Sequence, residues 1–193
     1  MNVATTRVPF AFHTPKSHDP IPYAGSSAAD HLIQASLDRH VVSIRLVDRL
    51  AHGGRTVRVA APLIGRDDGE SFVALLAGGH PERDPDHGAV RAAIAAAGLV
   101  ARAVAPEEVA IEPLATTARV IWRQRHVGVD PGMRLGLLAA FATEASMTVH
   151  ELCSRVPGPR DPVFAVMALA CEARLHLDLS EGFDLSTTVW GPR

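Results

Sequence analysis

Lysine is almost absent from this sequence. Of its 19 basic residues, 18 are arginine, and the only lysine is Lys16. Such a bias usually follows from genomic base composition, so it indicates no function by itself. It does exclude any mechanism that needs a lysine beyond the first few residues.

Cysteine and long apolar runs are also scarce. Cys153 and Cys171 are the only two cysteines and lie in apolar, helix-like surroundings. We expect buried free thiols there, with a disulfide or redox pair as the alternative. Residues 1–20 lack the apolar core of a signal peptide, and no run approaches the roughly 20 apolar residues of a membrane span. We therefore expect a cytoplasmic protein with no membrane partner.

The sequence has no strong excess of charge of either sign. Its 193 residues carry a net charge of −2, and 47% of them are hydrophobic, as in an ordinary globular protein. The length allows one sizeable core, or a main core with a small satellite domain. Because the whole chain is not basic, an anion-binding surface would have to be a local patch.

Motifs for nucleophilic catalysis and phosphate binding are missing too. There is no G-x-S-x-G, and neither cysteine has a basic neighbour to stabilise a thiolate. The glycine pairs at 53–54 and 78–79 lack the Lys-Ser/Thr or the following helix of a phosphate loop. The sequence therefore favours neither kind of site.

The first two thirds of the chain predict an α/β (α+β) domain over residues 23–127. Residues 1–22 contain four prolines and are expected to form an extended arm over the surface. A small mixed sheet flanked by helices is the expected architecture. The expected helices are 27–39, 86–98 and 116–125, and strand-like content occupies 41–50, the arms around the Asp-Gly turn of 58–78, and 100–113.

Residues 128–193 predict a winged-helix-like domain. Asp130 and Pro131 start one helix, the capping box Thr148–Glu151 a second, and Asp161 a third, before the strand-like residues 175–179. Three short helices followed by a strand are typical of a helix-turn-helix with a wing. The third helix offers only Glu172 for contacts with bases. Helices this apolar more often pack against another domain or subunit.

One polar loop gathers possible metal ligands. Oxygen and imidazole ligands there are able to converge on a cation. The prolines and glycine around them indicate a solvated turn, and no surrounding shell of partners is evident, so we expect no metal and no cofactor. These weak candidates are His80, Asp84, Asp86 and His87.

The best local basic patch surrounds Trp122. Arg119 and Arg123 are four residues apart and share one helix face. A solvated basic surface and a contact with the phosphate backbone of DNA are the two interpretations. The DNA-binding candidates are Arg119, Arg123, Arg125 and His126, with Arg134 and Arg160 as extensions from the second domain.

The order of these elements resembles a known family. A helix entered through Ser27, the strand VVSIRLV, a hairpin, the segment Arg119–Arg123 and a winged-helix tail are similar to the TnsA-type endonuclease subunit of cut-and-paste transposons. The resemblance covers most of residues 24–180. It implies a restriction-endonuclease-like fold followed by a winged helix.

The resemblance also implies where a metal site would lie. In such nucleases a Glu on the first helix, an Asp on the first hairpin arm and a Glu-x-Lys or Gln-x-Lys on the second hold a metal that activates water. Asp30 matches the first position, and its alternative role is helix capping. The acid is missing at Pro62-Leu63, and both acid and lysine are missing in Phe72–Leu76. The resemblance therefore implies a catalytically degenerate member, with Asp30 as a relic.

We thus expect a non-catalytic nuclease-fold protein that acts as a DNA-associated accessory or regulatory factor linked to a mobile element. Two alternatives stay open. One is a protein-interaction or homodimerisation module without DNA binding, which uses the apolar third helix and the Ala-rich helices. The other is an active metal-dependent endonuclease, for which the ligand set is incomplete.

Overall fold

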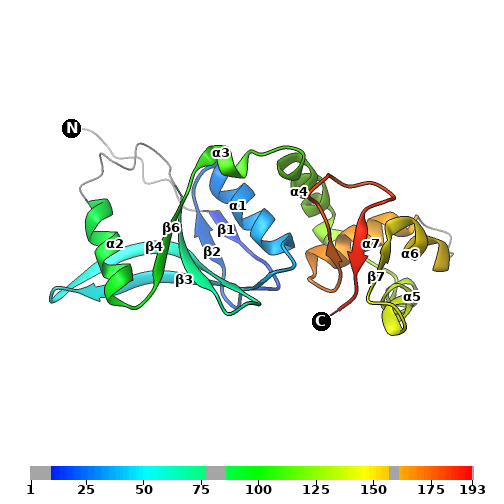
Figure 1. Cartoon of the computed structure of the whole chain (residues 1–193), viewed down its shortest axis with the longest axis horizontal. Coiled ribbons are helices and arrows are strands. Elements are labelled where there is room, and N and C mark those ends of the chain that lie inside the picture. Colours follow the sequence, from blue (N-terminus) through cyan, green and yellow to red (C-terminus); the bar gives the residue numbers. More distant parts are fainter. Residues whose placement is uncertain (1–9, 77–85, 157–160, 193) are drawn as a thin grey trace.

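A four-stranded mixed sheet and a group of short helices follow each other along the chain (Figure 1). The computed structural model describes residues 10–76, 86–156 and 161–192, without the side chains of Asp86 and His87. The first elements are β1 (Phe10–Phe12), β2 (Ile21–Tyr23), α1 (Ser26–Leu37), β3 (Val41–His52), β4 (Arg55–Arg66), β5 (Ser71–Leu76), α2 (Asp86–Ala96) and β6 (Val100–Val104). The elements that follow are α3 (Pro106–Val109), α4 (Leu114–Trp122), the 3₁₀ helix η2 (Arg123–His126), α5 (Pro131–Ala139), the 3₁₀ helix η3 (Ala140–Ala142), β7 (Ser146–Thr148), α6 (Val149–Arg155), α7 (Pro162–Cys171), β8 (His176–Leu177) and β9 (Thr188–Trp190).

The sheet has the strand order β3-β4-β5-β6, antiparallel except for the parallel pair β5–β6. Side chains alternate between its two faces, as the strand period of two requires. Ile64 and Ala74 join the core that contains Leu32 of α1. Leu63 and Val73 face the other way and pack with Ile94 of α2. The predicted mixed sheet flanked by helices is confirmed.

The predicted hairpin over 58–78 is also confirmed for the residues that the structure describes. β4 pairs with β5 from Leu63↔Val73 to Gly65↔Ser71, and the Arg66 N–H donates to the Glu70 carbonyl at 2.8 Å. Gly69 turns the chain with φ of 86°, a conformation that favours glycine. The Asp-Gly pair therefore sets the turn, and the turn sets the register.

The strand expected over 100–113 ends much earlier. β6 stops at Val104, and Pro106 begins the helix α3. Proline suits the first position of a helix. Glu107 and Glu108 lie in the first turn, where their negative charges interact favourably with the positive end of the helix dipole. The prediction was wrong beyond Val104 because these helix-start signals outweigh the apolar content of the segment.

Residues 10–23 contribute two large apolar side chains to the core, which the surface arm predicted from the prolines of residues 1–22 does not include. β1 and β2 form an antiparallel pair, and Phe12 and Ile21 are buried. The Phe12 ring stacks on Trp122 at a centroid distance of 5.0 Å. This segment closes the core beside α4, a role that its irregular sequence pattern did not indicate.

The three predicted helix starts in residues 128–193 are confirmed. Asp130 accepts hydrogen bonds from the backbone of α5, Thr148 and Glu151 form a capping box at α6, and Asp161 caps α7. Beside these helices, the short strands form a sheet in the order β7-β9-β8. The strand predicted over 175–179 is present as the shorter β8.

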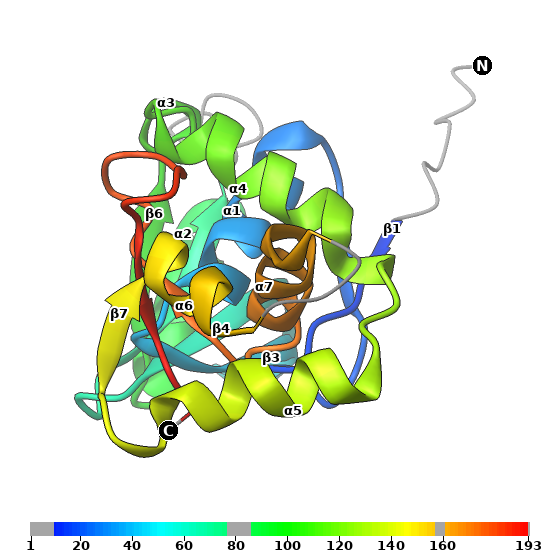
Figure 2. The same cartoon turned by 90° about the vertical axis from the view of Figure 1, so that its right-hand side faces the viewer.

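Helix α7 lies at the centre of the C-terminal helices, as Figure 2 shows. Residues 165–171 are all buried, and the helix contacts α1, α4, η2, α5 and α6. The apolar sequence predicts packing against another domain or subunit, and in the structure α1 and α4, from the predicted first domain of the same chain, cover part of this helix. No helix within the described ranges has the length and apolar character to cross a membrane.

The burial of β2 gives a direct test of the N-terminal packing. Ile21→Ala should lower the free energy of unfolding by about 2–5 kcal/mol, because it leaves a cavity at a fully buried position. Phe10→Ala is the matched control, since Phe10 is 67% exposed, and should change stability little. Urea denaturation measures both. Equal, small effects of the two substitutions would show that residues 10–23 are not part of the core.

Candidate functional site

The hairpin walls, where the family resemblance implies metal ligands, are made of core residues. Pro62 and Leu63 are buried on β4, and Val73 and Ala74 are buried on β5. Leu63 and Val73 pack under α2, whereas Ala74 lies in the core that contains Leu32 of α1, so these positions are not open to solvent on either face of the sheet. These positions contribute apolar packing to both faces of the sheet.

Asp30 is engaged by an arginine from a distant part of the sequence. Its two carboxylate oxygens accept hydrogen bonds from Arg119 Nε at 2.8 Å and Nη2 at 2.7 Å. The hydrogen bond to Asp30 raises the pKa of the Arg119 guanidinium above its usual value. This two-point contact ties α1 to α4 and uses the carboxylate that a metal would need.

The alternative prediction, that Asp30 caps the helix, is wrong. The residue that caps α1 is Gly25, no side chain makes a capping hydrogen bond, and the first turn contains no acidic residue. The helix begins before Ser27, which places Asp30 beyond the first turn. Its carboxylate is therefore oriented by the ion pair with Arg119.

The polar loop with the weak metal-ligand candidates lies largely outside the described residues. His80 and Asp84 lie outside the described residues, and Asp86 and His87 start α2 but their side chains are not described. In the part of the chain that the structure describes, no three His, Cys, Asp or Glu side chains gather as a cation site would require.

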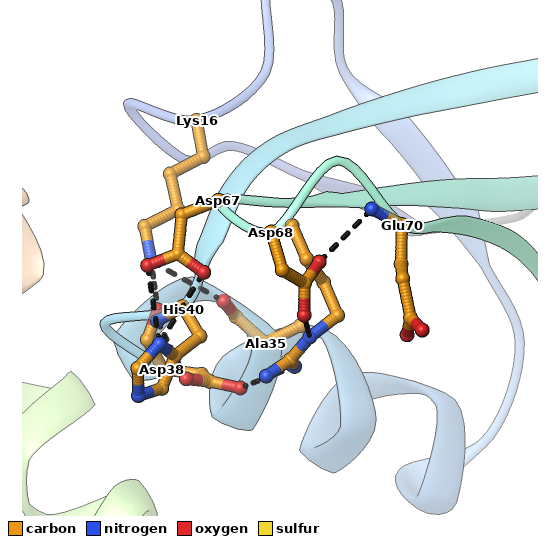
Figure 3. Close-up of polar contacts among 8 residues, drawn as sticks. Lys16, Ala35, Asp38, His40, Asp67, Asp68 and Glu70 are labelled. Carbon is orange, nitrogen blue, oxygen red and sulfur yellow. Dashed lines mark hydrogen bonds and ion pairs between the residues drawn. The ribbon is translucent and has the colours of Figure 1, made fainter.

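The single lysine lies close to the end of the β4–β5 hairpin. Lys16 is buried, and its Nζ donates to the carbonyl of Asp38 at 2.5 Å and that of Ala35 at 3.4 Å. A cation at the last carbonyls of a helix is favourable, so Lys16 stabilises the C-terminal end of α1. Figure 3 shows its side chain pointing toward the carboxylate of Asp67. No spacing pattern around Lys16 indicates this role.

Other side chains fix the hairpin tip to the same end of α1 (Figure 3). His40 Nδ1 lies 3.1 Å from Asp67 Oδ2, and the Asp67 N–H donates to the His40 carbonyl at 2.9 Å. Arg66 donates to Asp38 at 3.2 Å and lies 3.6 Å from Asp68. Asp67 and Asp68 of the tip are therefore held by neighbouring side chains, His40 and Arg66, which favours a structural role for both.

A cleft of about 630 Å³ opens between α1, the sheet and β8. Its lining includes His31, Arg39, Phe72, Arg102 and Trp190. Burial, followed by the charge of Arg102, lowers the pKa of His31 below the usual 6.5, so its ring is neutral at pH 7. The Arg39 guanidinium stacks on Trp190 at 4.0 Å. The cleft has the size of a small-molecule site.

The charges of this cleft are largely balanced inside the protein. Arg66 contacts Asp38, and Arg102 lies 3.6 Å from Glu108. His31 Nε2 and Arg39 Nε are buried without a hydrogen-bond partner among the described residues. The lining thus offers two polar atoms but no net charge that would select a particular ligand.

The structure divides the predicted DNA-binding residues into two groups. Arg119 is held by Asp30, and Arg134 makes a two-point ion pair with Glu172 that joins α5 to α7. Arg123, Arg125 and His126 lie exposed on η2, next to one another. Arg160 lies outside the described residues.

The exposed group on η2 borders an aromatic groove. The groove has a volume of about 450 Å³, and its lining includes Tyr23, Trp122, Arg125 and His126. Arg125 Nη1 donates to the Trp122 carbonyl at 3.0 Å. This hydrogen bond orients the guanidinium and leaves its other N–H groups for further contacts. Cations beside aromatic rings are the side chains that contact phosphates and bases in nucleic-acid grooves. We call Arg123, Arg125 and His126 the η2 patch.

Both cysteines are free, as predicted. Burial raises the pKa of the Cys153 thiol to about 11 and that of Cys171 to about 12. The Cys171 thiol also donates to the Ile121 carbonyl at 3.3 Å. Neither thiol is therefore activated as a nucleophile near neutral pH.

Comparison with known proteins adds no assignment. No protein-family model matches the sequence, and no curated protein is significantly similar to it.

The role of Asp30 is tested by a double-mutant cycle with Asp30→Ala and Arg119→Ala. The pair should show a coupling of about 1 kcal/mol in the free energy of unfolding, because its two-point geometry is favourable but Arg119 is partly exposed. Magnesium should leave the thermal midpoint unchanged. A coupling near zero, together with magnesium stabilisation that Asp30→Ala abolishes, would instead identify Asp30 as a metal ligand.

The Arg134–Glu172 pair predicts a pH dependence of stability. The hydrogen bond from Arg134 lowers the pKa of Glu172 below its usual 4.5. As the pH falls, Glu172 is therefore protonated in the unfolded chain before it is protonated in the folded one. The stabilisation by the ion pair is complete well above pH 4.5 and is lost as the pH falls through the pKa of Glu172 in the folded protein.

Glu172→Gln should thus be less stable than the wild type at pH 7, with a difference that shrinks below pH 4.5. Urea denaturation over a pH series measures it. Glu181→Gln is the control, since Glu181 is exposed and no ion pair is recorded for it among the described residues. A Glu172→Gln effect that is independent of pH would contradict this role.

Proposed function

We propose that this protein is a non-catalytic nuclease-fold protein that binds DNA as an accessory or regulatory factor. The observation that carries the proposal is the chemistry of the β4–β5 hairpin. Buried Leu63, Val73 and Ala74 occupy its walls, where a metal-dependent nuclease requires carboxylates and a lysine. The function that remains for such a fold is binding.

The arrangement of the elements supports the nuclease-like part of this proposal. Helix α1, the antiparallel strands β3, β4 and β5, the crossover helix α2 and the parallel strand β6 follow each other in the order that the resemblance implies. The C-terminal order α5-β7-α6-α7-β8-β9 supports a winged-helix arrangement, with three helices and a small sheet.

The state of Asp30 supports the absence of cleavage. A single carboxylate cannot assemble a metal site that activates water. The ion pair with Arg119 also satisfies both oxygens of this carboxylate. A catalytic role would require breaking a contact that joins α1 to α4.

The η2 patch supports DNA binding. Its two arginines and His126 are exposed, and the groove beside them contains Tyr23 and Trp122. Arginines neutralise backbone phosphates without reading sequence, which suits an accessory factor that another subunit directs. By the same resemblance, that other subunit would belong to a transposon.

The alternative function, a protein-interaction module, loses its main sequence argument. It depended on the apolar third helix together with the Ala-rich helices, and residues 165–171 of the third helix are buried against α1, α4, α5 and α6 of the same chain. We therefore favour DNA over a second copy of the chain as the partner.

Binding to a labelled 30-bp duplex tests this proposal by fluorescence anisotropy. Wild-type protein should bind at about 50 mM salt, with an affinity that falls steeply as salt increases. Arg123→Ala/Arg125→Ala should weaken binding and reduce the salt slope by about 1–2, since each lost phosphate contact removes about 0.9.

Arg155→Ala/Arg174→Ala is the control, because it removes the same charge from exposed positions elsewhere. It should leave the slope unchanged. No binding of the wild type at about 50 mM salt would refute the DNA-binding proposal.

A further inference from the structure

Strands β3 and β4 continue well past the sheet as a two-stranded ribbon. β5 pairs with β4 only between Leu63 and Gly65, whereas the β3–β4 pairing continues to His52↔Arg55. We call residues 47–60 the ribbon. Figure 1 shows that it forms one end of the long axis of the molecule and runs beside α2.

The two faces of the ribbon differ in chemistry. Leu50 and Val59 pack with Val90 and Ile94, so one face is held against α2. Side chains alternate along a strand and cross-strand partners share a face, so the pair Arg49↔Arg58 faces away from α2. The next pair on that outer face is Ala51↔Thr56, and all four of these residues are exposed.

The ribbon is positively charged in a chain that is negative overall. It contains three arginines and one acid, for a net charge of +2, while the whole chain has −2. The Arg49 side chain is 69% exposed and lies 3.6 Å from Asp48, and an exposed pair of this kind contributes little. No ion pair is recorded for Arg55 or Arg58 among the described residues.

The placement of these charges is unfavourable for the isolated protein. Arg49 and Arg58 are direct cross-strand partners, and like charges in that position destabilise a strand pair. A polyanion close to the ribbon would attract both arginines and so offset the repulsion between them.

We infer that the ribbon inserts into the major groove of duplex DNA, with its outer face toward the bases. This inference rests on the proposed DNA-binding function and adds a second surface, separate from the η2 patch. The major groove is about 12 Å wide and accepts a two-stranded ribbon. Arg49 and Arg58 have the chemistry to bind guanine N7 and O6, and Thr56 to contact a base edge.

The tip of the ribbon suits this insertion. Gly53 and Gly54 form a two-residue turn with φ of 57° and 73°, so no side chain widens the tip. Arg55 is exposed directly after the turn, where its charge would contact a backbone phosphate. The ribbon thus presents base contacts on its outer face and a phosphate contact at its end.

Duplex DNA fits this surface better than RNA or lipid does. The major groove of A-form RNA is too deep and narrow for side chains to read. Insertion into a lipid surface requires large apolar side chains, and the outer face of the ribbon offers only Ala51 and the methyl group of Thr56.

The inference is tested with Arg49→Ala/Arg58→Ala in the same anisotropy assay. At about 50 mM salt we expect at least tenfold weaker binding to the 30-bp duplex. A duplex with 7-deazaguanine lacks the N7 acceptor in the major groove, and it should bind the wild type at least fivefold more weakly than the normal duplex. The double variant should not distinguish the two duplexes.

The ribbon variant must also be folded. Because it removes a like-charge pair, its thermal midpoint should equal or exceed that of the wild type. Lys substitutions at both positions keep the charge but replace the rigid planar fork of arginine with a single flexible ammonium group. Arg49→Lys/Arg58→Lys should therefore keep the salt dependence of the wild type and distinguish the two duplexes less strongly than the wild type does.

The outcomes separate this inference from the proposed function. If the wild type binds DNA and only Arg123→Ala/Arg125→Ala weakens it, the ribbon inference is overturned and DNA binding stands. Equal binding of both duplexes by the wild type would also overturn insertion into the major groove. Absence of binding by the wild type, or ribbon-dependent binding to phosphatidylglycerol vesicles alone, would overturn both proposals.

Discussion

The burial of α7 is the constraint on which the rest of the structure depends. Its residues 165–171 are covered on all sides, by α1 and α4 from the first part of the chain and by α5 and α6 from the second. A helix this apolar needs partners around its whole circumference. Its burial unites the apolar residues of α1, α4 and the C-terminal helices in one core. The same packing brings α4 against α1, where Arg119 reaches Asp30.

This packing explains why positions that could carry chemistry serve stability instead. The hairpin walls add Leu63 and Val73 to the apolar layer under α2, and Ala74 to the layer under α1. Asp30 stabilises the contact of two helices, and Lys16 holds the end of α1. The exposed charged groups include those of the η2 patch and of the outer face of the ribbon. This distribution supports the binding function that we propose.

Local signals in the sequence predicted much of the fold. The Asp-Gly turn and the caps at Asp130, Thr148 and Asp161 are each formed by neighbouring residues, and the structure contains all of them. The contacts of the candidate site join residues that are far apart in the sequence. Arg119 meets Asp30 across 89 positions, and Lys16 meets Asp38 across 22, and no local pattern specifies either contact. The strands β1, β7 and β9 have three residues each, too few to show a period.

The central claim, DNA binding without cleavage, is tested most directly on supercoiled plasmid. The wild-type protein is incubated with the plasmid in magnesium or manganese, and parallel samples are run on agarose gels before and after proteolysis. Bound protein should retard the plasmid before proteolysis, and the plasmid should be fully supercoiled afterwards because it has not been cleaved. Nicked or linear product that Asp30→Ala abolishes, or plasmid of unchanged mobility in low salt, would contradict the central claim.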